Sequence, residues 1–239
     1  MQSQNSLNLS NGIFFKLKSS FKKFYKNSNF YDKKISKTFD NNFEYKPSPH
    51  LLSSIIRYQK KKYKIEDFAT EAIWQNNISS KDLKKLNNFF WFFSLDLKSS
   101  KETTQSILLN WIKKNEKFNE NTWEFNITAK RIIAWLSNHQ LTYEDSNEEY
   151  RLFFNHMLQK QTNHLLNEVK NLNATQEKLI GCAAIILTGL AYKDEKNYLD
   201  SGLNILKTII KESLDKQGFP KSRNIQNLVF YLKYLIIIR

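Results

Sequence analysis

The chain has 239 residues, 41% of them hydrophobic, with only five Gly and three Pro, which fits one large globular domain of the all-α class, with or without an appendage. Its single cysteine, Cys182, excludes an intramolecular disulfide and a cysteine-based metal site. The net charge of +14 is uneven, because residues 1–64 hold 14 Lys or Arg against 3 Asp or Glu.

This basic region is compatible with nucleic acid, an acidic glycan or an anionic membrane as partner. An A- and T-rich genome would enrich Lys, Asn and Ile in the same way without any partner. We expect no nucleic acid, because no helix-turn-helix, RNA-binding or zinc-finger signature is present. None of the four histidines forms a close ligand pair, so no metal and no cofactor are expected.

No run of about 18 apolar residues predicts a membrane span. The polar start, Met1 to Ser6, is not a secretory signal. The expected location is therefore the cytoplasm, with the periplasm as the alternative.

Residues 1–46 are expected to form a basic N-terminal extension rich in Phe and Tyr. One turn of it is amphipathic, which is compatible with a helix on a membrane surface. We favour the alternative, a strap packed on the main domain. The aromatic side chains of this turn, and the lysines opposite them, are Phe21, Phe24 and Tyr25 against Lys22, Lys23 and Lys26.

Pro47-Ser48-Pro49 is the expected boundary to a helical domain over residues 47–239. Apolar residues recur there at the spacing of a helix. Ser80 is expected to cap a helix running through Phe90, and the aromatic stretch 89–97 must pack against something large. The expected helices cover about residues 51–59, 80–90, 100–114, 129–136, 147–170, 174–192, 195–213 and 224 to the end.

The expected helix over 174–192 is apolar nearly all round and includes Gly181 and Gly189, which indicates burial on most sides with close neighbours. It alternates with amphipathic helices, as in stacked helix hairpins that curve into an incomplete (α/α) toroid. No Gly or polar tail follows the last apolar run, so we expect the full protein to continue beyond Arg239.

Arg131, Trp135 and Asn138 lie at i, i+4 and i+7 on a helix that Asn126 is expected to cap. A guanidinium, an indole and an amide in one row could meet the charge, ring face and hydroxyls of a sugar acid. Taken alone, the helix favours a different interpretation, in which Arg131 is an internal strut tied to a carboxylate and Trp135 is core.

Several blocks of the chain resemble the N-terminal half of heparinase II/III-like proteins, over about residues 82–239. The most specific are Arg131–Leu136 and Ser222-Arg223-Asn224. The resemblance implies an incomplete (α/α) toroid followed by a β-sandwich region, with a uronate polysaccharide bound between them. The other matching residues are Trp91, Asp96, Leu97, Trp111, Ile112, Trp123, Thr128, Ala129, Lys130 and Gly218.

Family lyases abstract a proton from the uronate and eliminate the 4-linked sugar, using an Asn, a Tyr and a His. Here Gln176 matches the Asn position and Ile225 the Tyr position. The first hypothesis is thus a polysaccharide lyase-like enzyme of which this chain alone is inactive. The second is a non-catalytic protein that binds acidic glycan or assists cell-envelope assembly. The candidate substrate-binding residues are Arg131, Trp135, Asn138, Gln176, Lys221, Arg223 and Asn224.

Overall fold

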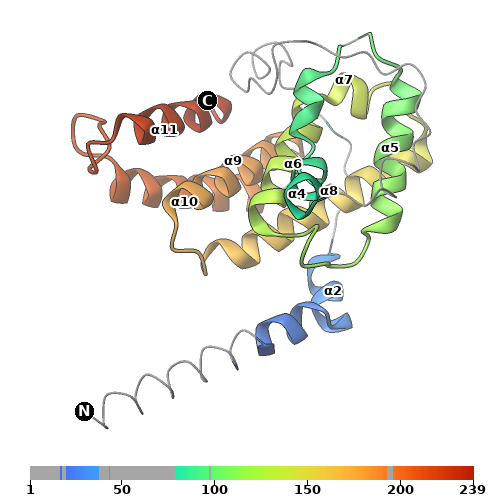
Figure 1. The fold of residues 1–239 in the computed structure, drawn as a ribbon, viewed down its shortest axis with the longest axis horizontal. Helices are drawn as coiled ribbons and strands as arrows, with labels where there is room; N and C mark the ends of the chain where they lie inside the picture. The colour runs from blue at the N-terminus through green and yellow to red at the C-terminus, as the bar shows by residue number, and fades with distance from the viewer. Residues whose placement is uncertain (1–16, 18–19, 38–42, 44–78, 97, 193–195) are drawn as a thin grey trace.

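A computed structural model describes residues 17, 20–37, 43, 79–96, 98–192 and 196–239 (Figure 1). These residues form helices and no strand, which confirms the expected all-α class. The predicted helix over 51–59 and the predicted boundary at Pro47–Pro49 lie outside them. The described elements are α2 (Asn29–Ile35), α4 (Ser80–Asn87), the 3-10 helix η2 (Phe90–Ser94), α5 (Lys101–Lys114), α6 (Phe125–Ser137), α7 (His139–Thr142), α8 (Glu148–Val169), α9 (Thr175–Ala191), α10 (Lys196–Ser213) and α11 (Ile225–Ile237).

Helix α9 is the centre of the fold and contacts α6, α8, α10 and α11. Its residues are buried from Leu179 to Gly189, as its nearly all-round apolar sequence predicts. Two glycines let neighbours approach closely: a Cβ at Gly181 would lie 2.2 Å from the Phe125 ring, and one at Gly189 would lie 2.5 Å from the backbone nitrogen of Leu199. The α9–α10 and α6–α9 packings therefore depend on these positions.

The aromatic stretch after α4 packs against α6, as its composition predicts. Phe89 is fully buried, and its ring meets Trp111 and Trp135 edge to face at centroid distances of 5.8 and 5.5 Å. Such T-shaped pairs add about 0.5–1.5 kcal/mol each beyond the burial of their area. The aromatic residues thus lock α4, α5 and α6 into one core.

Three local predictions are wrong. Ser79, not Ser80, caps α4, by accepting a hydrogen bond from the Asp82 amide. The helix from Ser80 ends at Asn87 rather than continuing to Phe90, because Phe89 adopts the left-handed conformation (φ 56°) and starts a 3-10 turn. Helix α6 begins at Phe125, with Glu124 as its N-cap residue. The Glu124 carbonyl already accepts the first intrahelical hydrogen bond, from the Thr128 amide, so Asn126 lies inside the first turn and does not cap it.

The described part of the N-terminal extension, residues 20–37, is called the N-terminal arm. It lies beside α8 and projects from the helical body (Figure 1). Tyr31 and Ile35 are its buried residues, and Asn163 of α8 donates to the Ile35 and Lys37 carbonyls at 2.8 Å. The arm is therefore packed on the main domain, as the strap interpretation predicts.

Candidate functional site

The turn between α10 and α11 holds three of the predicted site residues in a fixed shape. An isolated antiparallel bridge joins Leu214 to Pro220. Asp215 accepts two backbone N–H bonds at 3.0 Å and pairs with the Arg223 guanidinium at 2.7 Å. Arg223 adopts a left-handed φ of 54°, which its amide bond to the Pro220 carbonyl supports. The backbone thus positions the Arg223 side chain, which is 68% exposed.

Gln176, in the first turn of α9, contacts the region after the α10–α11 turn although it is distant in the sequence. Its amide donates to the Asn227 side-chain oxygen at 2.9 Å, and the Asn227 amide donates to the Ser222 hydroxyl at 3.0 Å. Asn224 caps α11 by accepting from the Gln226 amide at 2.8 Å. The N-termini of α9 and α11 therefore lie together. Their shared surface, the α9–α11 surface, consists of Gln176, Lys221, Ser222, Arg223, Asn224 and Asn227.

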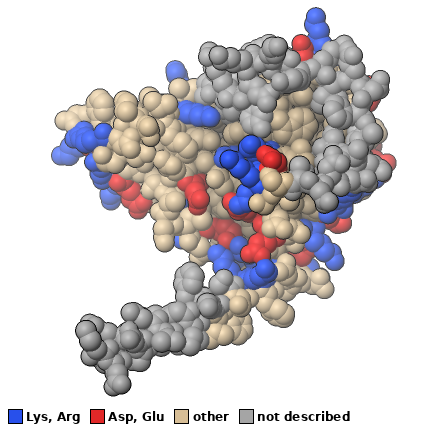
Figure 2. Space-filling model, in the orientation of Figure 1, with Lys and Arg blue, Asp and Glu red and all other residues tan. Residues whose placement is uncertain are grey.

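The α9–α11 surface combines positive charge, from Lys221 and Arg223, with two neighbouring carboxylates, Asp215 and Glu177 in the first turn of α9. Helix N-termini carry partial positive charge, and Ala174, the N-cap residue of α9, gives its first turn no side-chain acceptor. Backbone N–H groups, from Phe219 first, hold the pKa of Asp215 below its usual value, so this carboxylate stays charged and orients Arg223. Lys221 is exposed and donates to the Lys211 carbonyl at 2.8 Å. Figure 2 shows Lys and Arg side chains gathered at the end of the molecule where α10 and α11 are joined.

Arg131 does not lie on this surface, so its predicted place in a groove is wrong. Its side chain is fully buried and stacks on the Trp111 ring at 4.1 Å from the centroid. Its four hydrogen bonds all go to neutral groups. The acceptors are the Gln161 side-chain oxygen (2.6 Å), the Asn87 and Thr122 carbonyls (2.9 and 2.8 Å) and the Thr128 hydroxyl (3.2 Å).

Arg131 is thus an internal strut, as one interpretation predicts, but none of the four acceptors described above is the carboxylate that this interpretation expects. Glu124 pairs instead with Lys84, and Asp96 accepts from the Lys98 amide. Burial lowers the pKa of the Arg131 guanidinium well below its ordinary value. Its five N–H donors are still largely satisfied, which offsets part of the desolvation cost.

Trp135 and Asn138 are also core residues rather than groove residues. Trp135 is fully buried between the Phe89, Trp111 and Phe154 rings. Asn138 is 5% exposed and donates back to the Ala134 carbonyl at 2.8 Å. The structure therefore divides the predicted set into a buried group on α6 and an exposed group on the α9–α11 surface.

Sequence reasoning missed Asn227 and Asp215, the two side chains that organise the α9–α11 surface. Asn227 lies one turn after Asn224 and shows no signal of its own. Asp215 precedes a Gly-containing turn in the pattern Asp-Lys-Gln-Gly, which is typical of a carboxylate that caps its own loop amides. That pattern was the one signal by which Asp215 could have been found.

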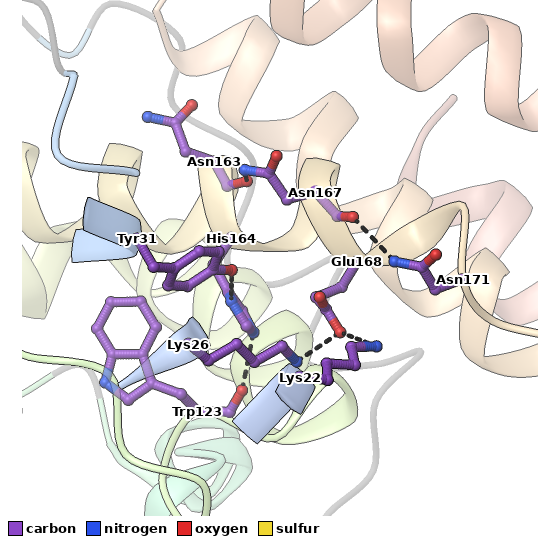
Figure 3. A network of polar contacts seen from close by, with 9 residues as sticks. All are labelled: Lys22, Lys26, Tyr31, Trp123, Asn163, His164, Asn167, Glu168 and Asn171. Atoms are coloured by element: carbon purple, nitrogen blue, oxygen red, sulfur yellow. Dashed lines mark hydrogen bonds and ion pairs between the residues drawn. The ribbon is translucent and has the colours of Figure 1, made fainter. Parts of the chain in front are cut away.

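His164 is a core residue. Its ring nitrogens lie 2.7 Å from the Tyr31 hydroxyl and 3.0 Å from the Trp123 carbonyl (Figure 3). Burial lowers its pKa to about 3, so the ring is neutral at physiological pH and does not face solvent. Within the described ranges, no group of three or more His, Cys, Asp or Glu could hold a metal ion.

No helix in the described part of the chain is long and apolar enough to cross a membrane. Comparison with models of protein families, with curated proteins and with solved structures finds no match to this chain.

Proposed function

We propose that this chain is the helical domain of a heparinase II/III-like protein, an incomplete (α/α) toroid that binds acidic, uronate-containing polysaccharide on the α9–α11 surface. The main observation behind the proposal is a chain of two hydrogen bonds, from Gln176 to Asn227 and from Asn227 to Ser222. The resemblance assigns Gln176 and the Ser222-Arg223-Asn224 block to one sugar site, although they lie far apart in the sequence. Their meeting in space supports that assignment.

The groups on this surface suit a uronate. The Arg223 guanidinium is planar and exposed, so it is able to hold a carboxylate by two parallel hydrogen bonds. Lys221 adds a second positive charge nearby in the same turn. The amides of Gln176 and Asn227 offer donors and acceptors for sugar hydroxyls. Arg131 and Trp135, being buried, take no part in this proposal.

Two features of the site favour the alternative in which glycan is bound without elimination. Ile225, at the position where the family places its Tyr, is 68% exposed and carries no proton to transfer. The ionisable side chains described in this turn are Asp215, Lys216, Lys221 and Arg223. Loop amides and Arg223 hold Asp215 as a charged carboxylate. We therefore propose binding as the activity of these 239 residues, with elimination requiring groups supplied from elsewhere.

Binding of polygalacturonate oligosaccharides, measured by isothermal titration calorimetry, tests this proposal. Arg223→Gln and Lys221→Gln should each weaken binding by about tenfold, the effect of one lost charge-assisted contact. Lys114→Gln, which removes an exposed lysine at the end of α5, is the matched control and should bind like the parent. Both site variants should melt close to the parent, because exposed ion pairs contribute only about 0–1 kcal/mol.

Equal affinity of all four proteins for polygalacturonate would exclude the α9–α11 surface as the glycan site. The same samples should give no rise in ultraviolet absorbance from unsaturated uronate. Steady formation of that product by the purified chain would contradict binding without elimination.

A further inference from the structure

The first turns of the N-terminal arm are attached to the body by their polar side. Lys26 and Lys22 both pair with Glu168 of α8, at 2.6 and 2.9 Å (Figure 3). Lys23 pairs with Glu120 at 2.6 Å. Burial raises the pKa of Glu168, but the hydrogen bonds from Lys26 and Lys22 outweigh this effect and leave its pKa below the ordinary value. These ion pairs fix which side of the arm faces the protein.

The apolar side of the same turns consequently faces outward. Phe21 is 72% exposed and Phe24 is 79% exposed. Leu17, one helical turn before Phe21, is 51% exposed as well. An amphipathic helix in a soluble domain normally buries this side. The reversal leaves large aromatic side chains in water at a fixed orientation, which indicates a partner surface for them.

Helix α2 carries a further exposed aromatic residue and positive charge. Tyr31 and Ile35 are buried against the body, and Phe30 points the other way and is 71% exposed. The only acidic residue between positions 20 and 37, Asp32, pairs with Lys160 of α8 at 2.8 Å. Three exposed lysines lie in or directly after α2: Lys33, Lys34 and Lys37.

We propose that the N-terminal arm is a membrane-surface anchor, which inserts Phe21, Phe24 and Phe30 into the interface of an anionic bilayer. Aromatic side chains flanked by lysines, with no outward acid between positions 20 and 37, match a negatively charged lipid surface. Helix α2 lies at the edge of the helical body, beside α8, so its exposed side is not covered by the other described helices (Figure 1).

Flotation of the full chain with lipid vesicles tests this proposal. The parent should float with vesicles of equal phosphatidylglycerol and phosphatidylcholine, and far less with phosphatidylcholine alone or at high salt. The triple variant Phe21→Ser, Phe24→Ser, Phe30→Ser should lose at least about tenfold in affinity. Its melting temperature should be unchanged, because all three rings are exposed. Lys33→Gln, Lys34→Gln and Lys37→Gln together should weaken binding to the anionic vesicles.

The matched control carries Val229→Ser, Leu232→Ser and Ile236→Ser, which remove three exposed apolar side chains from α11 instead. It should float like the parent. Flotation of the phenylalanine variant equal to that of this control would overturn the proposal, as would failure of the parent to float with anionic vesicles. A parent dimer that the phenylalanine variant converts to monomer, without vesicle binding, would assign the aromatic side to a second copy of the chain and overturn it too.

Discussion

Replacing Arg131 with Ala should lower the free energy of unfolding by about 3–5 kcal/mol, as for a buried charged group removed from its partners. The variant would leave the Gln161 oxygen and the Asn87 and Thr122 carbonyls without their donor. It would also open a cavity against the Trp111 ring. Urea unfolding followed by circular dichroism measures the loss.

Two companion variants complete this test: one keeps the charge at position 131, and the other removes a different arginine. Arg131→Lys keeps a positive charge but loses the planar fork and the stacking, so it should also be strongly destabilised. Arg151→Ala removes a half-buried arginine that contacts Tyr143 and Ser146, and it should cost no more than about 1 kcal/mol. Stability of Arg131→Ala within about 0.5 kcal/mol of the parent would contradict the strut.

Gly189→Ala should destabilise the domain by about 1–3 kcal/mol, although Ala is the better helix former at a site with room. The added Cβ would lie 2.5 and 2.8 Å from the backbone nitrogen and Cα of Leu199. Backbone atoms have no rotamer by which to move away, so α10 as a whole must shift from α9. Thermal unfolding at one pH, followed by circular dichroism, measures the effect.

Gly181→Ala is the comparison for this prediction. Its Cβ would lie 2.2 Å from Cζ of Phe125, which is the far end of a side chain and is able to move by a small rotation about χ1. The substitution should therefore cost less than Gly189→Ala. Equal or greater stability of Gly189→Ala relative to the parent would show that α9 and α10 are not packed as closely as described.

The sequence predicts the long helices well, because their apolar residues must face one core. The helices expected over 147–170 and 174–192 correspond to α8, Glu148–Val169, and α9, Thr175–Ala191. The all-round apolar character of the second also predicts its central place. The helix positions and the central place of α9 follow from the spacing and the number of apolar residues, which a single sequence shows.

Local backbone geometry is less predictable. The left-handed Phe89 is set by tertiary contacts, since its ring fills the space between Trp111 and Trp135. A bulky residue at positive φ is disfavoured on its own, so no propensity rule would place it there. The outward orientation of Phe21 and Phe24 is likewise decided by Glu168, which lies more than a hundred residues away in the sequence.

Contacts with residues distant in the sequence also explain why only some of the predicted site residues lie on one surface. A helical stripe of Arg131, Trp135 and Asn138 has the same spacing whether it lines a groove or a core. Arg131 lies in the core because its hydrogen-bond acceptors there are Gln161 and the Asn87 carbonyl, which are 30 and 44 residues away in the sequence. By contrast, Ser222-Arg223-Asn224 follows a turn with a positive-φ glycine, Gly218, and such turns lie at the surface.

Recognition of a uronate carboxylate is tested by titrating this chain with polygalacturonate oligosaccharides and with their methyl esters. Esterification removes the charge and leaves the sugar backbone and its hydroxyls in place. Such recognition predicts binding of the free acid and at least about tenfold weaker binding of the ester, since the Arg223 fork loses its anionic acceptor. Equal affinity for the two, or binding of neither, would contradict it.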